Sequence, residues 1–354
     1  MKSGSKRQAN FELLRIVAMF MIISLHYLVK GGIATPFPFP AKENPAGVLA
    51  WLVEAFCIVA VNCYVLISGY FLVESAWKPG RAVSLVLQVL FYSLLVPSLL
   101  LLTGVVSAGD LDLYDWIGFA FPFGTEHYWF ATAYLVMYLF APFLAAGIEK
   151  MKKRDLQILL VFLFAVFSLE KTVSPLYLAT DRYGYDFGWF LCLFVAAGYI
   201  RRYGISWLDR QSHAAGLYAL SCVLIWLFSL AANTVGSKME TFVHYADMLY
   251  TYNHLLCVTG AVSLFYVFKN MRVREGRFAE AVRKLAPYTF GVYLLHEHIL
   301  VRYEWMKWLG AEKVKESFLF VPHLLLCVAA VYAVGTAVDF VRARIFSMAG
   351  KRRQ

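Results

Sequence analysis

Long runs of apolar residues recur along this chain, and they constrain its fold more than any other feature. A helix needs about 20 predominantly apolar residues to cross the hydrocarbon core of a bilayer. Ten segments approach or reach that length. They cover residues 12–30, 48–73, 82–106, 128–148, 156–170, 186–200, 214–232, 248–268, 285–302 and 318–341. The sequence therefore predicts an all-α, polytopic integral membrane protein with about ten transmembrane helices.

Composition supports one membrane domain over two soluble domains, although 354 residues would be long enough for two. The chain is 60% hydrophobic and only 16% charged, whereas soluble domains are nearer half apolar and a quarter charged. We expect a cytoplasmic N-terminal tail at 1–11, a transmembrane domain at 12–341 and a basic cytoplasmic C-terminal tail at 342–354.

The distribution of positive charge predicts the orientation of the helices. With the N-terminus in the cytoplasm, the cytoplasmic tails and loops carry 23 of the 33 Lys and Arg residues, and the outer loops carry nine. This is the bias that places positive loops inside. Both termini are then cytoplasmic. The net charge of +10 faces cytoplasm and anionic lipid, which argues against nucleic-acid binding.

The first predicted helix carries two polar residues that a membrane segment does not need. Arg15 and His26 are eleven residues apart, which is about 20° more than three full helical turns and about 16 Å along the axis. Both side chains therefore point the same way. Arg15 alone could extend to lipid phosphates, and His26 alone could be interfacial, but one cavity along this face explains both.

The second predicted helix carries a carboxylate in its outer half and a small polar sequence near its cytoplasmic end. The carboxylate is Glu54, and the polar sequence is Ser68, Gly69 and Tyr70. Charged residues within a membrane segment are costly and usually functional. For Gly69 the alternative is close helix packing, for which membrane proteins commonly use small residues.

Further histidines lie at similar depths toward the outer side. His127 precedes Trp129 in the string EHYWF, His254 is in the eighth segment, and His296 is in the ninth. An aromatic belt at the membrane boundary is the alternative explanation for EHYWF. Together with His26, these histidines indicate proton transfer near neutral pH.

The sequence does not predict a metal site. No helix carries the i, i+3 or i, i+4 His and carboxylate pairs that metal sites often use, and no cysteine spacing is typical of zinc. His296 and Glu297 are adjacent, so in a regular helix they differ by about 100° in direction and cannot face one site without a distortion. The sequence thus offers a histidine base but shows no metal site, no nucleophilic triad and no phosphate-binding loop. This combination favours direct transfer of an activated acyl group to a hydroxyl.

Several motifs together resemble the acyltransferase type 3 membrane family, which contains bacterial enzymes that O-acylate surface glycans. Arg-x10-His in the first helix resembles the signature of that family. The strings NCYVLISGYF, KPGRAVSLVLQVLFYSLLVP, HYWFATAYLVMYLFAPFL and PYTFGVYLLHEHI are similar to its later motifs, and they occur in the family order from Arg15 to His296. One departure is Cys63-Tyr64, where the family usually has an aromatic pair. The family has a ten-helix core.

The resemblance implies an enzyme of the bacterial plasma membrane. It would move an acyl group, most commonly acetyl, from cytoplasmic acyl-CoA to a hydroxyl of a surface polysaccharide or lipid-linked glycan. The donor is a co-substrate, and no permanently bound cofactor is expected. The expected catalytic residues are His26, Arg15, His127 and His296. The expected donor-binding residues are Arg15, Arg81, Ser68, Gly69 and Tyr70. The expected acceptor-binding residues are Glu54, Trp129 and His254.

Three alternatives remain open from the sequence. A transporter or flippase for a lipid-linked glycan or small acid would share the helices and buried charges, although no internal repeat typical of transporters is visible. A non-catalytic scaffold would retain its function when His26 is replaced by Ala. An acyltransferase with an amino group as acceptor would have the same donor site.

Overall fold

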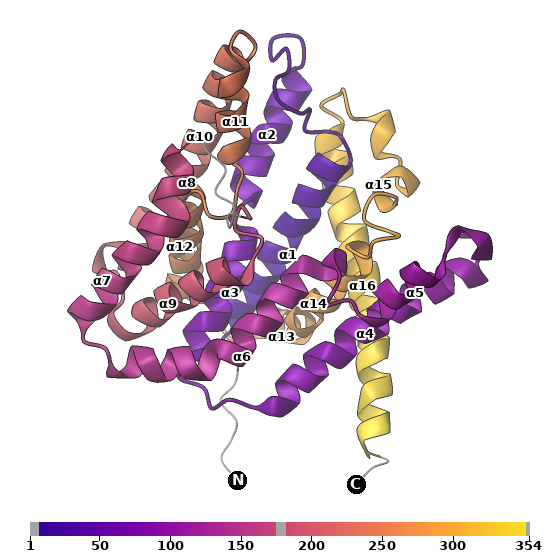
Figure 1. Ribbon diagram of the computed structural model, residues 1–354, viewed down its shortest axis with the longest axis horizontal. Coiled ribbons are helices and arrows are strands. Elements are labelled where there is room, and N and C mark those ends of the chain that lie inside the picture. Colours follow the sequence, from indigo (N-terminus) through magenta and orange to yellow (C-terminus); the bar gives the residue numbers. More distant parts are fainter. Residues whose placement is uncertain (1–6, 175–181, 352–354) are drawn as a thin grey trace.

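The computed structural model describes residues 7–174 and 182–351, and this part of the chain is helical throughout, without a strand. The α-helices are α1 (Ala9–Lys30), α2 (Pro45–Cys57), α3 (Ala60–Leu72), α4 (Pro79–Leu102), α5 (Leu113–Ala120), α6 (Trp129–Lys150), α7 (Lys153–Phe164), α8 (Glu170–Val173), α9 (Phe187–Tyr203), α10 (Gln211–Gly236), α11 (Val243–Met248), α12 (Leu255–Asn270), α13 (Arg277–Leu285), α14 (Thr289–His296), α15 (Trp305–Trp308) and α16 (Phe320–Lys351). The arrangement is shown in Figure 1.

Seven helical segments are long and apolar enough to cross a membrane among the described residues, so the chain is a multi-pass membrane protein. These are Ala9–Lys30, Pro45–Leu72, Pro79–Leu102, Trp129–Lys150, Lys153–Val173, Gln211–Gly236 and Phe320–Met348. The other three predicted segments contain shorter helices. α9 has 17 residues and α12 has 16, lengths of about 25 Å, whereas α14 has only eight.

The spans divide into a buried centre and an exposed rim. In α1, 67% of the span is buried inside the protein, and in the α2–α3 segment 78% is buried, against 17–33% in the other five. α1 packs against α2, α3, α12, α13, α14 and α16. The rim helices expose large apolar side chains such as Leu102 and Phe143, as lipid-facing helices should. The buried side chains of α1 are therefore shielded from lipid.

Figure 1 shows that α1 begins and α16 ends at the same end of the molecule. α16 continues to Lys351, beyond the boundary at 341 that the sequence predicts for the membrane domain. Arg342 Nε lies 2.6 Å from Oδ1 of the fully buried Asp339. The first residues of the predicted C-terminal tail therefore extend a packed helix.

The ninth predicted segment, 285–302, is wrong as one continuous helix. A 3₁₀ turn covers Ala286–Tyr288, and α14 ends at His296. Glu297, with φ −97° and ψ 3°, leaves the helical path. His298 then accepts the amide of Leu300 at Nδ1, 3.2 Å away, a local bond that favours a turn over a helix. Apolar periodicity could not reveal this early end, because the residues that follow remain apolar.

Candidate active site

A cavity of about 640 Å³ runs beside α1. From Glu12 onward, the α1 residues that line it recur every three or four positions, which places them on one helical face. The lining residues of α1 are Phe11, Glu12, Arg15, Met19, Ile22 and His26. From Glu12 to His26 this face is about 21 Å long. The structure thus places Arg15 and His26 along one cavity, on the shared face that their spacing predicts.

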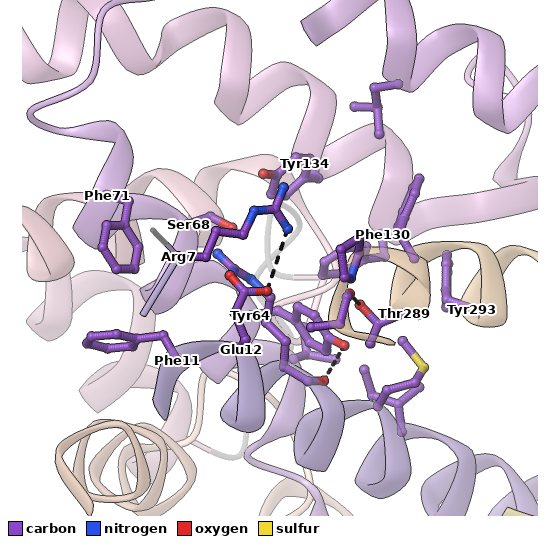
Figure 2. A pocket seen from close by; sticks show the side chains of 18 of the residues that line it. Arg7, Phe11, Glu12, Tyr64, Ser68, Phe71, Phe130, Tyr134, Thr289 and Tyr293 are labelled. Carbon is purple, nitrogen blue, oxygen red and sulfur yellow. Dashed lines mark hydrogen bonds and ion pairs between the residues drawn. The ribbon is translucent and has the colours of Figure 1, made fainter. Parts of the chain in front are cut away.

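Arginines gather at the end of the cavity near the start of α1. Arg7, Arg15 and Arg81 all line it. The carboxylate of Glu12 is ion-paired with Arg15 and lies 3.6 Å from Nη1 of Arg7. The hydroxyl of Tyr64 donates to the backbone carbonyl of Arg15 at 2.6 Å. Figure 2 shows Arg7, Glu12 and Tyr64 grouped in the pocket. This end combines positive charge with one buried carboxylate.

The residues expected to bind the donor divide into two groups. Arg15, Arg81 and Ser68 line the cavity, whereas Gly69 and Tyr70 do not. A Cβ on Gly69 would lie 2.8 Å from the Cβ of Ala197 on α9, so this glycine allows close helix packing, the alternative that the sequence left open. Tyr70 stacks on Phe11, with ring centroids 5.5 Å apart.

His26 lies toward the other end of α1 and meets the end of α14. Nδ1 of His26 is 3.0 Å from Nε2 of His296 and 3.2 Å from Oε2 of Glu297. The abrupt end of α14 supplies the distortion that these adjacent residues need to reach one site. Lys30 binds both oxygens of Glu297, and Nη1 of Arg302 is 3.7 Å from Oε1. Sequence periodicity kept Glu297 away from the site of His296, because it predicts a regular helix through residue 302, and no sequence motif singled out Lys30 or Arg302.

The hydrogen bonds determine which nitrogen of each neutral imidazole carries a proton. Nδ1 of His296 lies 2.6 Å from the carbonyl oxygen of Val292. A carbonyl only accepts, so this nitrogen must donate, and Nε2 of His296 must accept. His26 therefore donates from Nδ1, toward His296 and Glu297. Its Nε2 keeps a lone pair and makes no hydrogen bond among the described residues. His26, which lines the cavity, is therefore in the tautomer in which Nε2 can accept a proton.

The other expected catalytic and acceptor residues are more dispersed. His127 is buried but does not line the cavity, and its backbone carbonyl accepts from Arg302 at 2.7 Å. His254 caps α12 by accepting the amide of Leu256 at 3.2 Å, also away from the cavity. Glu54 is buried outside the lining as well, and Trp129 is part of the lining. Of the four histidines expected to gather, the structure brings His26 and His296 into direct contact.

His26, His296 and Glu297 form the one cluster of potential metal ligands found among the described residues, with ligand atoms within 4.8 Å of one another. Sequence spacing did not predict this cluster, since α1 and α14 are distant in the chain. Lys30 and Arg302 already surround the carboxylate with positive charge, which disfavours a divalent cation at the same oxygens. The bonds of His26 fit proton transfer better than metal binding.

One comparison with known proteins identifies a related family. A family model described as an acyltransferase domain matches residues 8–341, nearly the whole chain. No curated protein and no solved structure matches the chain. The matched region contains Arg15 and Arg81 of the cavity, His26 on α1 and the end of α14, while Arg7 lies one residue before it.

Proposed function

Because the chain belongs to the acyltransferase type 3 family, we propose that it moves an acyl group, normally acetyl, from acyl-CoA to a hydroxyl of a surface polysaccharide or lipid-linked glycan. The supporting observation is one cavity that joins an arginine-rich end to the unbonded Nε2 of His26. An anionic donor and a reacting hydroxyl need these two features at opposite ends of one channel.

The proposed setting is the bacterial plasma membrane, with ten membrane segments and both termini in the cytoplasm. The start of α1 and the end of α16 lie at one end of the molecule (Figure 1), as an even number of segments requires. The excess of Lys and Arg in the loops on that side supports the orientation. The shorter α9 and α12 would then cross with little tilt, and the 285–302 segment would complete its crossing through α14 and the non-helical residues that follow His296.

The donor would enter from the cytoplasmic end. Arg15 and Arg81 would bind the phosphates of CoA, because guanidinium groups form paired, charge-assisted hydrogen bonds to phosphate oxygens. Ser68 would contact the pantetheine arm. Arg15 and His26 are about 16 Å apart along α1, a distance that an extended pantetheine arm can span to bring the thioester to the histidine.

The reaction would proceed by direct transfer. His26 Nε2 accepts the proton of the acceptor hydroxyl as its oxygen forms a bond to the thioester carbonyl carbon. The carbon–sulfur bond of the tetrahedral intermediate then breaks, and the CoA thiolate takes the proton from His26. Glu297 lies 3.2 Å from His26 Nδ1 and would stabilise the imidazolium between these steps. The acceptor ring would contact Trp129, the expected acceptor residue that lines the cavity.

The test uses purified protein in detergent and measures acetyl-CoA binding and slow CoA release. Wild type should bind acetyl-CoA and release CoA, whereas His26→Ala should bind it and release CoA at least about 100-fold more slowly. His213→Ala, a change in a half-buried histidine outside the cavity lining, is the matched control and should behave as wild type. Failure of wild type to bind any short acyl-CoA would refute the donor assignment.

A further inference from the structure

Tyr293 on α14 has a buried hydroxyl in an unusual environment. The residue is 5% exposed and lines the cavity, yet its Oη makes no hydrogen bond within the described part of the chain. A buried polar group without a partner costs about 1–3 kcal/mol, and such groups in native structures need an explanation. A ligand that enters the cavity and supplies the missing acceptor would explain this one.

The surroundings of Tyr293 indicate what that ligand atom carries. The ring of Tyr293 packs against the ring of Phe130, which lies in the first turn of α6, with ring centroids 5.7 Å apart. The phenolic proton has no acceptor within the described part of the chain. The first turn of a helix also favours negative charge. Both features suit an oxygen that is, or becomes, negative.

The position of Tyr293 suits one atom of the donor. Tyr293 precedes His296 by three residues on α14, so both lie on one helical face. His296 is hydrogen-bonded to His26. α14 starts near the lining residues Ala286 and Pro287. Figure 2 shows Tyr293 and Phe130 on one side of the pocket and Arg7 and Phe11 on the other. A donor anchored at the arginines would pass Tyr293 as its thioester approaches His26.

We infer that Tyr293 is a catalytic residue whose hydroxyl donates a hydrogen bond to the thioester carbonyl oxygen and to the oxyanion that replaces it. This inference rests on the proposed function. When the acceptor oxygen bonds to the carbonyl carbon, the π electrons move to the carbonyl oxygen, and Tyr293 stabilises that charge. The electrons return as the bond to sulfur breaks. Tyr293 keeps its proton throughout, while His26 carries the proton from the acceptor to sulfur.

The experiment compares Tyr293→Phe with wild type in acyl transfer, acetyl-CoA binding and thermal stability. Loss of an oxyanion donor lowers kcat by about 10²–10³-fold, and we expect this loss with only a small weakening of acetyl-CoA binding, because the hydrogen bond to the neutral carbonyl is weaker than the bond to the oxyanion. The melting temperature should stay the same or rise, because the hydroxyl has no partner in the empty protein. Tyr332→Phe is the matched control: Tyr332 is also buried with an unbonded hydroxyl but lies outside the cavity lining, so its kcat should not change.

Two outcomes would overturn the inference while leaving the proposed function intact. One is an active wild type whose Tyr293→Phe variant keeps a similar kcat. The other is a Tyr293→Phe variant that loses activity together with stability, which would assign the hydroxyl a structural role. A wild type that neither binds acetyl-CoA nor releases CoA would instead refute the proposed function and this inference with it.

Discussion

Nδ1 of His26 on α1 lies 3.0 Å from Nε2 of His296 on α14, although 269 residues separate them in the chain. The Val292 carbonyl determines the tautomer of His296, and His296 in turn determines the tautomer of His26. The end of a short helix thus prepares a base on a neighbouring helix.

Replacement of Glu297 by Gln should lower both stability and activity. Lys30 and Arg302 would then keep their charges without the carboxylate that faces them, and breaking a largely buried ion pair costs several kcal/mol. Because the Lys30 side chain is 16% exposed, we expect about 2 kcal/mol. Denaturant unfolding in detergent would measure it, with the turnover number measured in parallel.

The double variant Lys30→Met/Glu297→Gln provides the control for that prediction. It removes the unpaired lysine charge, so it should recover part of the lost stability. It should not recover turnover, because His26 still lacks the carboxylate 3.2 Å from its Nδ1. Full recovery of turnover would show that Glu297 contributes to stability and not to catalysis.

Replacement of Glu12 by Gln should tighten donor binding. Its carboxylate is paired with Arg15 and lies 3.6 Å from Arg7, so phosphates of the donor compete with it and are repelled by it. We expect the dissociation constant of CoA to fall about tenfold, a change of about 1.4 kcal/mol. Isothermal titration with 3′,5′-ADP and with pantetheine separates the charged and neutral halves of CoA. Only the charged half should bind more tightly, and weaker binding of 3′,5′-ADP would contradict the prediction.

Replacement of Gly69 by Ala should destabilise the protein and leave donor affinity unchanged. A Cβ there would lie 2.8 Å from Ala197 Cβ and 3.2 Å from Phe194 Cα on α9, so α3 and α9 would have to separate. Gly216→Ala is the matched control, since nothing lies within 4 Å of its Cβ position. Thermal melts and acetyl-CoA titrations of both variants provide the measurement. If the Gly69→Ala protein had normal stability but a weaker affinity for acetyl-CoA, Gly69 would be a donor-binding residue after all.

Chelators should leave activity unchanged. His26, His296 and Glu297 could offer three ligand atoms, but the adjacent positive charges of Lys30 and Arg302 oppose a divalent cation. We expect the same turnover after dialysis against EDTA and o-phenanthroline as before. Inactivation that added Zn²⁺ reverses would identify the cluster as a metal site and replace proton transfer by His26 with metal chemistry.

Much of the architecture followed from local features of the sequence. Apolar runs predicted the seven helices that are long and apolar enough to cross a membrane, because the hydrocarbon core selects for segment length and composition. The eleven-residue spacing of Arg15 and His26 placed both on one face of α1, because helical periodicity is a property of the backbone. Tyr293 was within reach of the same reasoning, since it lies in the string YTFGVYLLHEHI three residues before His296.

The partners of His26 depended on tertiary structure. Periodicity predicted a continuous helix from 285 to 302 and kept His296 and Glu297 apart, whereas the observed end of α14 lets both reach His26. His254 and His127 were expected at a similar depth, but the His254 side chain accepts the Leu256 amide, and the backbone carbonyl of His127 accepts from the Arg302 side chain. Sequence alone determined which segments are apolar enough to lie within a membrane and which side chains share a helical face, because those depend on hydropathy and backbone geometry. Only the folded chain decided which of them meet, because a contact between α1 and α14 depends on where each helix ends and how the two pack.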